Sequence, residues 1–552
     1  MKSLLLFTLV LAGGLLSCRR GEPGHALLYA RLRANAPFEM PAWDTPRFPD
    51  RTLLLTQCGG VGDGITLNTA AFEKGMETLA KQGGGHLIVP DGIWLTGPIV
   101  FRSHIDLHLE KGAILLFSPD KSLYPLVSTV FEGLDTRRCQ SPISGNGLEE
   151  VAITGEGVLD GNGHAWRPLK RQKVTESQWH RMTRGGVFKR ADYWYPSDSY
   201  LKGEQVSDMN VPTRLTSEEE WHEIKDFLRP VMVNFVRCKN VYLQGVTFQD
   251  SPAWCLHPLM CERVIIDGIT VRNPDYAQNG DGVDLESCKN AIIVNSSFDV
   301  GDDGICLKSG KDEDGRRRGV ACENVIVDNC TVYQGHGGFV VGSEMSGGVR
   351  NIRVSNCRFI GTDVGLRFKS RRGRGGTVEN IYAENISMMN IQTEPLLFDL
   401  FYGGQSAVEA LEAGDRQEQE GVVPVADETT PTFRNIFVKG LRCLNARRAL
   451  FFNGLPEQKI DRVEVENAII TARLGAELRE VTRIRLKEVT VRAAEGPALI
   501  LRNCKDVEVS GFQGFVREET PKVTLSGLLE GVNLGENFRE DEIITLPGTR
   551  WP

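Results

Sequence analysis

Short runs rich in β-branched residues recur along most of the chain. A typical run, Val325-Ile326-Val327, follows a polar residue, and a single Gly or Asn separates it from a second short run. An apolar pattern with a period of two is typical of strands, and its return roughly every 20 to 35 residues indicates a repeat architecture. The repeats begin at Asn240, Arg263, Asn290, Asn324, Asn351, Asn380, Asn435, Arg462, Arg483 and Asp506.

A second regular feature predicts how the strands of one repeat are joined. Five residues after the starting position stand Gly245, Gly268, Asn295, Asn329, Asn356, Asn385 and Gly440. Since Gly and Asn tolerate the left-handed region, we expect a left-handed corner between two strands. Stacked coils lie about 4.8 Å apart, so like residues align in columns. One interior column is expected to hold Cys238, Cys261, Cys288 and Cys322.

These patterns predict an all-β fold, a single-stranded right-handed parallel β-helix over about residues 40–540. No helical period of 3.6 separates the repeats, which disfavours leucine-rich and βαβ arrangements. Residues 66–82 form one amphipathic segment with Phe72, Met76 and Leu79 on its apolar face. We expect this segment to be a short helix that caps the N-terminal end of the solenoid. Two insertions interrupt the coils, near residues 165–229 and 402–432.

The N-terminus has the features of a targeting signal. Lys2 precedes an apolar stretch from Leu4 to Leu16, and Ser17-Cys18 follows. We interpret residues 1–17 as a lipoprotein signal peptide and Cys18 as the lipidated residue; the alternative is ordinary signal cleavage beside an incidental Cys. Either way the chain is expected to be exported, and the lipoprotein reading places it in the periplasm or outer membrane of a Gram-negative bacterium. No later run approaches a membrane span of about 20 apolar residues, so the lipid is the only predicted membrane link.

Composition and charge narrow the choice of partners. The 552 residues carry 64 Lys and Arg against 72 Asp and Glu, a formal charge of −8. Nucleic-acid binders are usually basic, so no nucleic-acid partner is expected. The 12 cysteines beyond Cys18 are expected to be mostly buried thiols, because several fall in the interior column. The sequence makes no prediction about oligomeric state.

Ionisable residues gather in a third strand column. Because residues i and i+2 of a strand share a face, Asp284, Lys308, Arg367 and Lys369 are expected to point outward. At the corner before this strand Asp281 stacks beside Asp303, with Asp302 adjacent, and His336 takes the equivalent place one coil on. An earlier coil aligns His257 with Asp284. A lone Asp at a coil corner is often only a turn residue, but two stacked beside a third favour chemistry.

Four short motifs of this column resemble those of glycoside hydrolase family 28, the polygalacturonases. They are Asn279-Gly280-Asp281, Gly301-Asp302-Asp303, Gly335-His336-Gly337 and Arg367-Phe368-Lys369. Two positions depart from the family pattern, Gly280 in place of Thr and Phe368 in place of Ile. Phe368 points inward and is expected to be harmless, whereas Gly280 is expected to widen the site and leaves the substrate's identity open.

The resemblance implies an inverting glycosidase that cleaves α-linked galacturonate in pectin, with no cofactor and no metal. It implies that Asp302 is the general acid, that Asp281 and Asp303 position the water, and that His336 tunes the acid. Glycoside hydrolysis needs one protonated and one ionised carboxyl. When three carboxyls are crowded together, repulsion between their charges makes it unfavourable for all three to be ionised. Arg367 and Lys369 are expected to bind the uronate carboxylate. Further candidates for substrate binding are Asn279, Lys308, Asp284 and His257.

The first insertion bears on the mode of attack. It contains Trp166, Trp179, Trp194 and Tyr195 among many Lys and Arg residues, a composition that suits a sugar-facing wall. Such a wall beside the Asp281 coil would close one end of the groove, so we expect exo-action. The alternatives are an endo-acting or rhamnogalacturonan-directed hydrolase of the same family, a β-helix polysaccharide lyase that uses Ca²⁺, and a noncatalytic glycan-binding β-helix.

Overall fold

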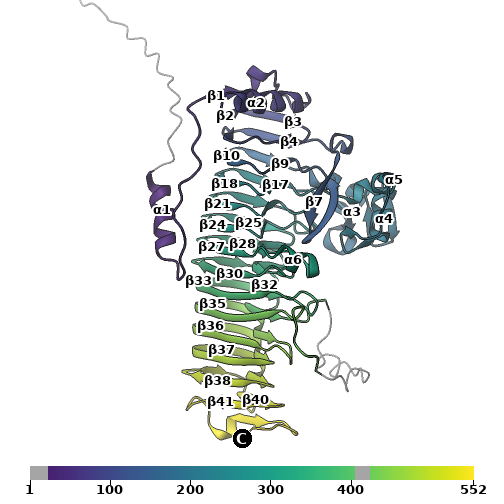
Figure 1. Ribbon diagram of the computed structural model, residues 1–552. Helices are drawn as coiled ribbons and strands as arrows, with labels where there is room; N and C mark the ends of the chain where they lie inside the picture. The colour runs from purple at the N-terminus through teal and green to yellow at the C-terminus, as the bar shows by residue number, and fades with distance from the viewer. Residues whose placement is uncertain (1–22, 404–422, 552) are drawn as a thin grey trace, which may run out of the picture.

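The computed structural model describes residues 23–403 and 423–551, and in it the repeats stack as coils of short parallel strands (Figure 1). Each strand pairs in parallel with the equivalent strand of the coil before and after it, so the strands form three columns. The chain winds with the right-handed sense that parallel crossovers adopt. The predicted all-β, right-handed parallel β-helix is confirmed.

Each column is an unbroken parallel sheet through the middle of the molecule. The first contains β5 (Ile105–Leu109), β10 (Glu149–Gly155), β18 (Lys239–Gln244), β21 (Glu262–Asp267), β24 (Lys289–Val294), β27 (Cys322–Asp328) and β30 (Val349–Ser355). The second contains β6 (Ala113–Phe117), β11 (Val158–Asp160), β19 (Thr247–Gln249), β22 (Thr270–Arg272), β25 (Ser297–Val300), β28 (Thr331–Gln334) and β31 (Arg358–Ile360). The third contains β9 (Ile143–Asn146), β17 (Val233–Val236), β20 (Leu256–Leu259), β23 (Val283–Glu286), β26 (Asp303–Lys308), β29 (Gly337–Val341), β32 (Val364–Lys369) and β34 (Leu396–Asp399).

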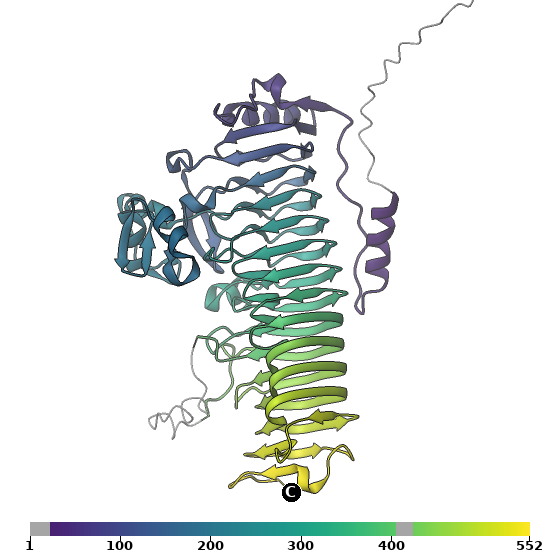
Figure 2. The same cartoon turned by 180° about the vertical axis from the view of Figure 1, so that it is seen from behind.

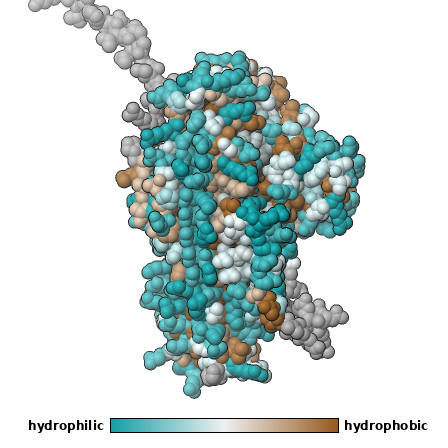
Figure 3. All heavy atoms as spheres, viewed as in Figure 1, coloured by the Kyte–Doolittle hydropathy of each residue, from teal (hydrophilic) through white to brown (hydrophobic). Residues whose placement is uncertain are grey.

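Toward the C-terminus the strands lengthen and run through the corners. These strands are β33 (Thr377–Ile391), β35 (Thr432–Asn453), β36 (Ile460–Arg479) and β37 (Val481–Arg502), followed by the shorter β38 (Lys505–Ser510), β40 (Val523–Ser526) and β41 (Glu530–Asn533). The outer surface in Figure 3 is mostly hydrophilic with scattered apolar residues. This distribution fits a solenoid whose apolar side chains fill its interior.

Ladders of asparagine side chains hold successive corners together. Asn324 and Asn351 have φ values of 57° and 58°, in the left-handed region. Asn351 Nδ2 donates to Asn324 Oδ1 at 3.1 Å, and Asn380 Nδ2 donates to Asn351 Oδ1 at 3.2 Å. The seven corner positions predicted from the sequence, such as Asn329 at 50° and Gly440 at 73°, also have positive φ. The left-handed corner is therefore confirmed, and its amide side chains link one coil to the next.

The interior is closed at its N-terminal end by a helix. α2 (Thr69–Lys81) buries Phe72, Met76 and Leu79 against the first coils, as its amphipathic pattern predicted. The cysteine column is also interior, because Cys238, Cys261, Cys288 and Cys322 are all buried free thiols. The interior is therefore apolar along the stack, and the corners and outer faces are left for polar side chains.

A second helix lies outside the stack. α1 (Pro23–Ala34) runs along the flank of the first column (Figure 2) and buries Tyr29 and Leu32 against Ile265 and Ile292. Tyr29 Oη donates to Asp267 Oδ2 at 2.6 Å, which fixes the helix to β21. The predicted signal peptide and Cys18 lie outside the described residues. Among the described helices none is long and apolar enough to cross a membrane.

The first insertion is a folded lobe. It contains α3 (Glu176–Met182), β13 (Val187–Arg190), β14 (Tyr193–Tyr195), α4 (Asp198–Gln205) and α5 (Glu218–Glu223), and it lies beside the hairpin of β7 (Leu126–Phe131) and β8 (Leu134–Cys139). Trp166, Trp179, Trp194 and Tyr195 are at most 8% exposed. The expectation that these aromatics face sugars is wrong, because three of them form the lobe's own core and Trp166 packs against Tyr124 and Cys139. Most of the second insertion, residues 404–422, lies outside the described residues.

The asparagine ladder generates a stability prediction. Asn351→Ala removes the side-chain hydrogen bonds to both neighbouring coils. It also leaves an alanine in the left-handed region, which alanine adopts less readily than asparagine. We expect it to lower the free energy of unfolding by about 1–3 kcal/mol, measured by urea denaturation. Asn351→Gly loses the same bonds but adopts positive φ freely, so its loss should be smaller. Equal losses in the two variants would show that backbone strain plays no part at this corner.

Candidate active site

The polar cluster predicted from the sequence forms at the N-terminal ends of the third-column strands. Asp281 precedes β23, Asp302 precedes β26, which begins at Asp303, and His336 precedes β29. Because these strands pair in register, with Asp303 opposite Gly337, their leading corners lie one above the other. The register of the columns alone therefore brings together residues up to 55 positions apart in the sequence.

Glycine is required where these corners touch neighbouring backbone. A Cβ at Gly301 would lie 2.4 Å from the carbonyl oxygen of Pro274, which is closer than real contacts allow. A Cβ at Gly280 would lie 2.7 Å from the Cβ of Ala277. The expectation that Gly280 widens the site is wrong, because Ala277 occupies that space. Phe368 points inward and stacks on Phe398 with ring centroids 4.6 Å apart, as its interior position implied.

Three carboxylates converge at this edge. One oxygen from each of Asp281, Asp302 and Asp303 lies within 4.8 Å of the other two. The Asp302 side chain is 21% exposed, whereas Asp281 and Asp303 are only 3% and 1% exposed. Of the three, Asp302 is therefore the carboxyl most accessible to a molecule in solution.

Asp303 is ionised because two cations compensate it. Lys369 Nζ donates to Asp303 Oδ2 at 2.7 Å, and Arg367 donates to Asp303 Oδ1 at 3.3 Å. Burial alone would raise the pKa of Asp303, but the charges of Lys369 and Arg367 outweigh it and hold that pKa well below its ordinary value. Burial likewise works against the charged forms of Lys369 and Arg367, yet Asp303 helps to raise the pKa of both.

Asp302 pairs with His336. His336 Nδ1 lies 3.1 Å from Asp302 Oδ1, and the ring is 40% exposed. The hydrogen bond and charge of Asp302 raise the pKa of His336. Burial raises the pKa of Asp302, but the bond and charge from His336 dominate and lower it. Both shifts favour an ion pair in which the imidazole carries the proton.

Asp281 has the opposite electrostatic environment. Its Oδ1 is buried without a hydrogen-bond partner. Burial, followed by the nearby charges of Asp302 and Asp284, raises the pKa of Asp281 well above its ordinary value. The cluster thus contains a carboxyl that favours its proton beside one, Asp303, that is held ionised. This separation of pKa values is typical of acid–base sites.

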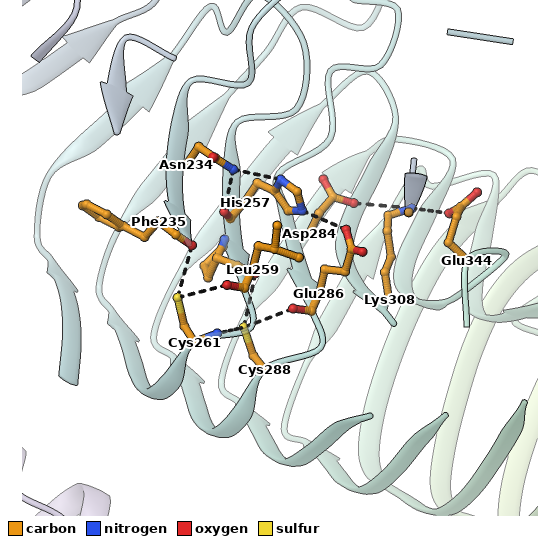
Figure 4. A network of polar contacts seen from close by, with 12 residues as sticks. Asn234, Phe235, His257, Leu259, Cys261, Asp284, Glu286, Cys288, Lys308 and Glu344 are labelled. Carbon is orange, nitrogen blue, oxygen red and sulfur yellow. Dashed lines mark hydrogen bonds and ion pairs between the residues drawn. The ribbon is translucent and has the colours of Figure 1, made fainter. Parts of the chain in front are cut away.

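A buried polar network lies next to the cluster on the same sheet (Figure 4). Lys308 Nζ donates to Glu344 Oε2 at 2.9 Å and lies 3.5 Å from Asp284 Oδ1. His257 Nε2 lies 2.9 Å from Glu286 Oε2. Burial raises the pKa of Asp284 well above its ordinary value, against the opposing charge of Lys308.

This burial corrects three predicted substrate contacts. Asp284 and His257 are 0% exposed and Lys308 is 4% exposed, so none of them can touch a substrate in this structure. Their outward direction was predicted correctly, but other segments cover them. Trp254 lies 4.8 Å from Lys308 Nζ, and Arg318 of α6 (Asp312–Arg318) donates to Glu286 at 2.6 Å.

Asn279 has a positioning contact that the sequence did not indicate. Arg229, which is fully buried, donates to Asn279 Oδ1 at 2.8 Å and to the Gln278 carbonyl oxygen at 2.9 Å. Arg229 ends the first insertion, so it joins that lobe to the turn before Asp281. Nothing in the repeat pattern marks it. Tyr402, whose ring centroid lies 5.0 Å from Lys369 Nζ, belongs to no motif either.

Among the described residues, one group has the donors for a divalent cation, and it is the same cluster of Asp281, Asp302 and Asp303. Their negative charge is already balanced by Arg367, Lys369 and Lys308, which all retain their protons because nearby acidic groups raise their pKa values. The cluster thus retains little of the net negative charge that favours a divalent cation.

Comparison with known proteins agrees with the motifs. Residues 220–412 match the family model described as glycosyl hydrolases family 28. A probable polygalacturonase of Vitis vinifera is 30% identical over 68% of this chain and 65% of its own length. An exo-poly-alpha-D-galacturonosidase of Dickeya chrysanthemi is 28% identical over 64% of this chain and 57% of its own length.

A solved structure extends the match over most of the chain. The crystal structure of a hyperthermoactive exopolygalacturonase from Thermotoga maritima is similar, with a TM-score of 0.62 and 31% identity. The alignment covers 88% of this chain and 96% of that one. The chain spans less than two thirds of the lengths of the two curated relatives but nearly all of this structure. On the motifs, the fold and these similarities, the chain belongs to family 28 of the glycosyl hydrolases.

Proposed function

We propose that the protein hydrolyses α-linked galacturonate bonds of pectin with inversion at the anomeric carbon. The observation that carries this proposal is the carboxylate cluster, in which one exposed Asp is paired with a His and a buried Asp is held ionised by two cations. Family membership supports the reaction class. The names of the relatives support the substrate.

Asp302 is the group we assign to protonate the leaving oxygen. It is the accessible member of the cluster, and its pair with His336 carries one proton. A bound sugar that excludes water disfavours the separated charges of imidazolium and carboxylate, which favours moving that proton onto Asp302. The carboxyl then gives the proton to the glycosidic oxygen as its bond to the anomeric carbon breaks.

Asp281 and Asp303 are the groups we assign to the water. Asp303 is held ionised and accepts a hydrogen bond from the nucleophile. Asp281 is the stronger base, because burial raises its pKa, and it acts after it has released its own proton to solvent. The water gives one proton to this carboxylate pair, and its oxygen bonds the anomeric carbon from the face opposite the leaving group, which inverts the configuration.

Arg367 is the cation that we assign to the substrate carboxylate. Its side chain is 18% exposed, against 7% for Lys369, and a guanidinium can bond Asp303 and a uronate together. We assign Lys369 to the ionisation of Asp303 instead. The high pKa values of Arg367, Lys369 and Lys308 also count against the lyase alternative, since none of these cations is ready to abstract a proton from the sugar.

The first insertion supports exo-action by its position and not by its aromatic residues. Tyr193 Oη donates to Gln278 Oε1 at 2.9 Å, and Arg229 holds Asn279, so the lobe is fixed against the turn before Asp281. A folded lobe at this place closes one side of the carboxylate cluster. A site closed on one side accepts the end of a polysaccharide chain more readily than its middle. We therefore propose release of mono- or short galacturonides. Long fragments as the first products would favour the endo alternative.

Asp302→Asn removes the proton donor at nearly constant volume. We expect kcat on oligogalacturonides to fall by about 10²- to 10⁴-fold, with the circular dichroism spectrum and unfolding midpoint unchanged. Asp299→Asn, at an exposed position of β25, is the matched control and should keep wild-type activity. A variant at Asp302 that retains most of its kcat would remove this residue from the acid role.

Arg367→Gln keeps a hydrogen-bonding side chain but removes the charge. We expect kcat/KM on galacturonate substrates to fall by about 30- to 1000-fold, and to fall much less on their methyl esters, which lack the partner charge. Arg358→Gln, on the exposed side of β31, serves as the control. Equal losses on acid and ester would show that Arg367 acts only through Asp303.

The Asp302–His336 pair predicts the alkaline side of the pH profile. The pair loses its proton as the pH rises through the raised pKa of His336, so kcat/KM should fall there. In His336→Gln the proton resides on Asp302 alone, and the ordinary pKa of a carboxyl lies below that of an imidazole. The alkaline limb should therefore move to lower pH, whereas His222→Gln on α5 should leave it in place. An unmoved limb in the His336 variant would contradict the shared proton.

A further inference from the structure

A large groove on the same face of the solenoid has no part in the chemistry described above. Its volume is about 970 Å³, and none of the catalytic carboxylates lines it. The floor is formed by the early coils of the third column, including Ser144, Val236 and Leu259. The β7–β8 hairpin forms one wall, and Figure 1 shows β7 lying between these coils and the helices of the first insertion.

Packed side chains separate this groove from the catalytic cluster. Val130 and Val231 line the groove, and Val231 belongs to an apolar cluster with Phe131 and Trp254. The Phe131 and Trp254 ring centroids lie 4.5 Å apart, and Trp254 also contacts Lys308 of the buried network. The groove is therefore a site of its own and not an extension of the carboxylate cluster.

Positive charge dominates the lining of the groove. Five arginines face two acids, Asp135 and Asp314; the arginines are Arg137, Arg138, Arg237, Arg317 and Arg318. Arg317 pairs with Asp314. Two acids outside the groove pair with two more of the arginines, Glu218 with Arg137 and Glu286 with Arg318.

Two of the arginines add charge that no ion pair compensates. Arg237 is exposed at a coil corner, and no carboxylate of the described residues pairs with it. Arg138 is 2% exposed and donates to the carbonyl oxygens of Arg229 and Asn210, so it forms no ion pair within the described part of the chain, although the nearby Glu132 helps to hold its charge. A buried unpaired cation beside an exposed one raises the positive potential of the groove between them.

The remaining lining suits a sugar chain. Val100, Leu259 and Met260 offer apolar floor, and the half-exposed Trp221 offers a ring, with Arg137 5.7 Å from its centroid. Gln140 and Asn146 add amide donors and acceptors. Apolar surface for sugar faces together with guanidinium groups for carboxylates is the complement of an acidic polysaccharide.

We propose that this groove binds a segment of polygalacturonate as an accessory site, apart from the catalytic cluster. The inference rests on the proposed function for the choice of polymer. A long chain held in the groove stays near the active site while its end is cut, so the site raises the affinity for long substrates and leaves the cutting of short ones unchanged.

The experiment compares Arg237→Ala/Arg317→Ala with a matched control, Arg462→Ala/Arg350→Ala. Arg462 is, like Arg237, an exposed corner residue with positive φ, and Arg350 is, like Arg317, an exposed arginine in a single ion pair. We expect the groove variant to raise KM for long polygalacturonate about tenfold, and to change kcat/KM for trigalacturonate less than twofold. The control should match the wild type on both. An unchanged KM for the polymer, or an equal rise in the control, would overturn the proposal.

Direct binding separates this proposal from the proposed function. In the Asp302→Asn background we expect calorimetry to count two trigalacturonate molecules per protein, and one when Arg237 and Arg317 are also replaced. This result would support the groove even if the wild type hydrolysed no pectin. Suppose instead that the wild type hydrolyses pectin and that each of the two variants binds a single trigalacturonate. That result would overturn the groove proposal and leave the proposed function standing. Polyphosphate that binds the groove as tightly as trigalacturonate would overturn its assignment to uronates.

Discussion

Parallel pairing of coil on coil is the constraint on which the rest of this structure depends. Each coil must present the same positions to its neighbours about 4.8 Å away, because backbone hydrogen bonds between parallel strands fix that spacing. The same register that aligns the cysteines inside also aligns Asp281 and Asp303 outside. A cluster of like charges is thus built by the repeat itself, without a loop specialised to bring them together.

Such a cluster is unfavourable until its charges are compensated. Lys369 and Arg367, one coil beyond His336, neutralise Asp303, while His336 shares its proton with Asp302. Asp281 has no such partner and keeps a raised pKa. The unequal partners of three adjacent carboxyls thus give them the unequal proton affinities that acid–base hydrolysis requires. The interactions that stabilise the cluster are also the source of its reactivity.

The sequence predicted the features that depend on the repeat, such as which side chains point outward. It did not predict which of those side chains other segments cover. The period of two placed Asp284 and Lys308 on the outer face, and alignment of the motifs brought Asp302 to His336. The cover over Lys308 and Glu286, however, comes from Trp254 and α6, which no short-range pattern connects to them.

The insertions gave the weakest predictions for the same reason. An aromatic-rich segment such as the one that contains Trp194 has the same composition whether its rings form a core or a sugar platform. Its position before Arg229 was readable from the sequence, but the contact of Arg229 with Asn279 was not. Contacts between an irregular lobe and a regular solenoid leave no periodic signal.

The central claim is that crowded carboxylates cut a galacturonate chain by adding water. The most direct measurement is proton NMR of the first products of long polygalacturonate, digested with excess chelator. The account predicts saturated mono- or short galacturonides whose new reducing end is released as the β-anomer, before mutarotation. Products with a double bond between C4 and C5, the result of elimination rather than hydrolysis, would contradict it.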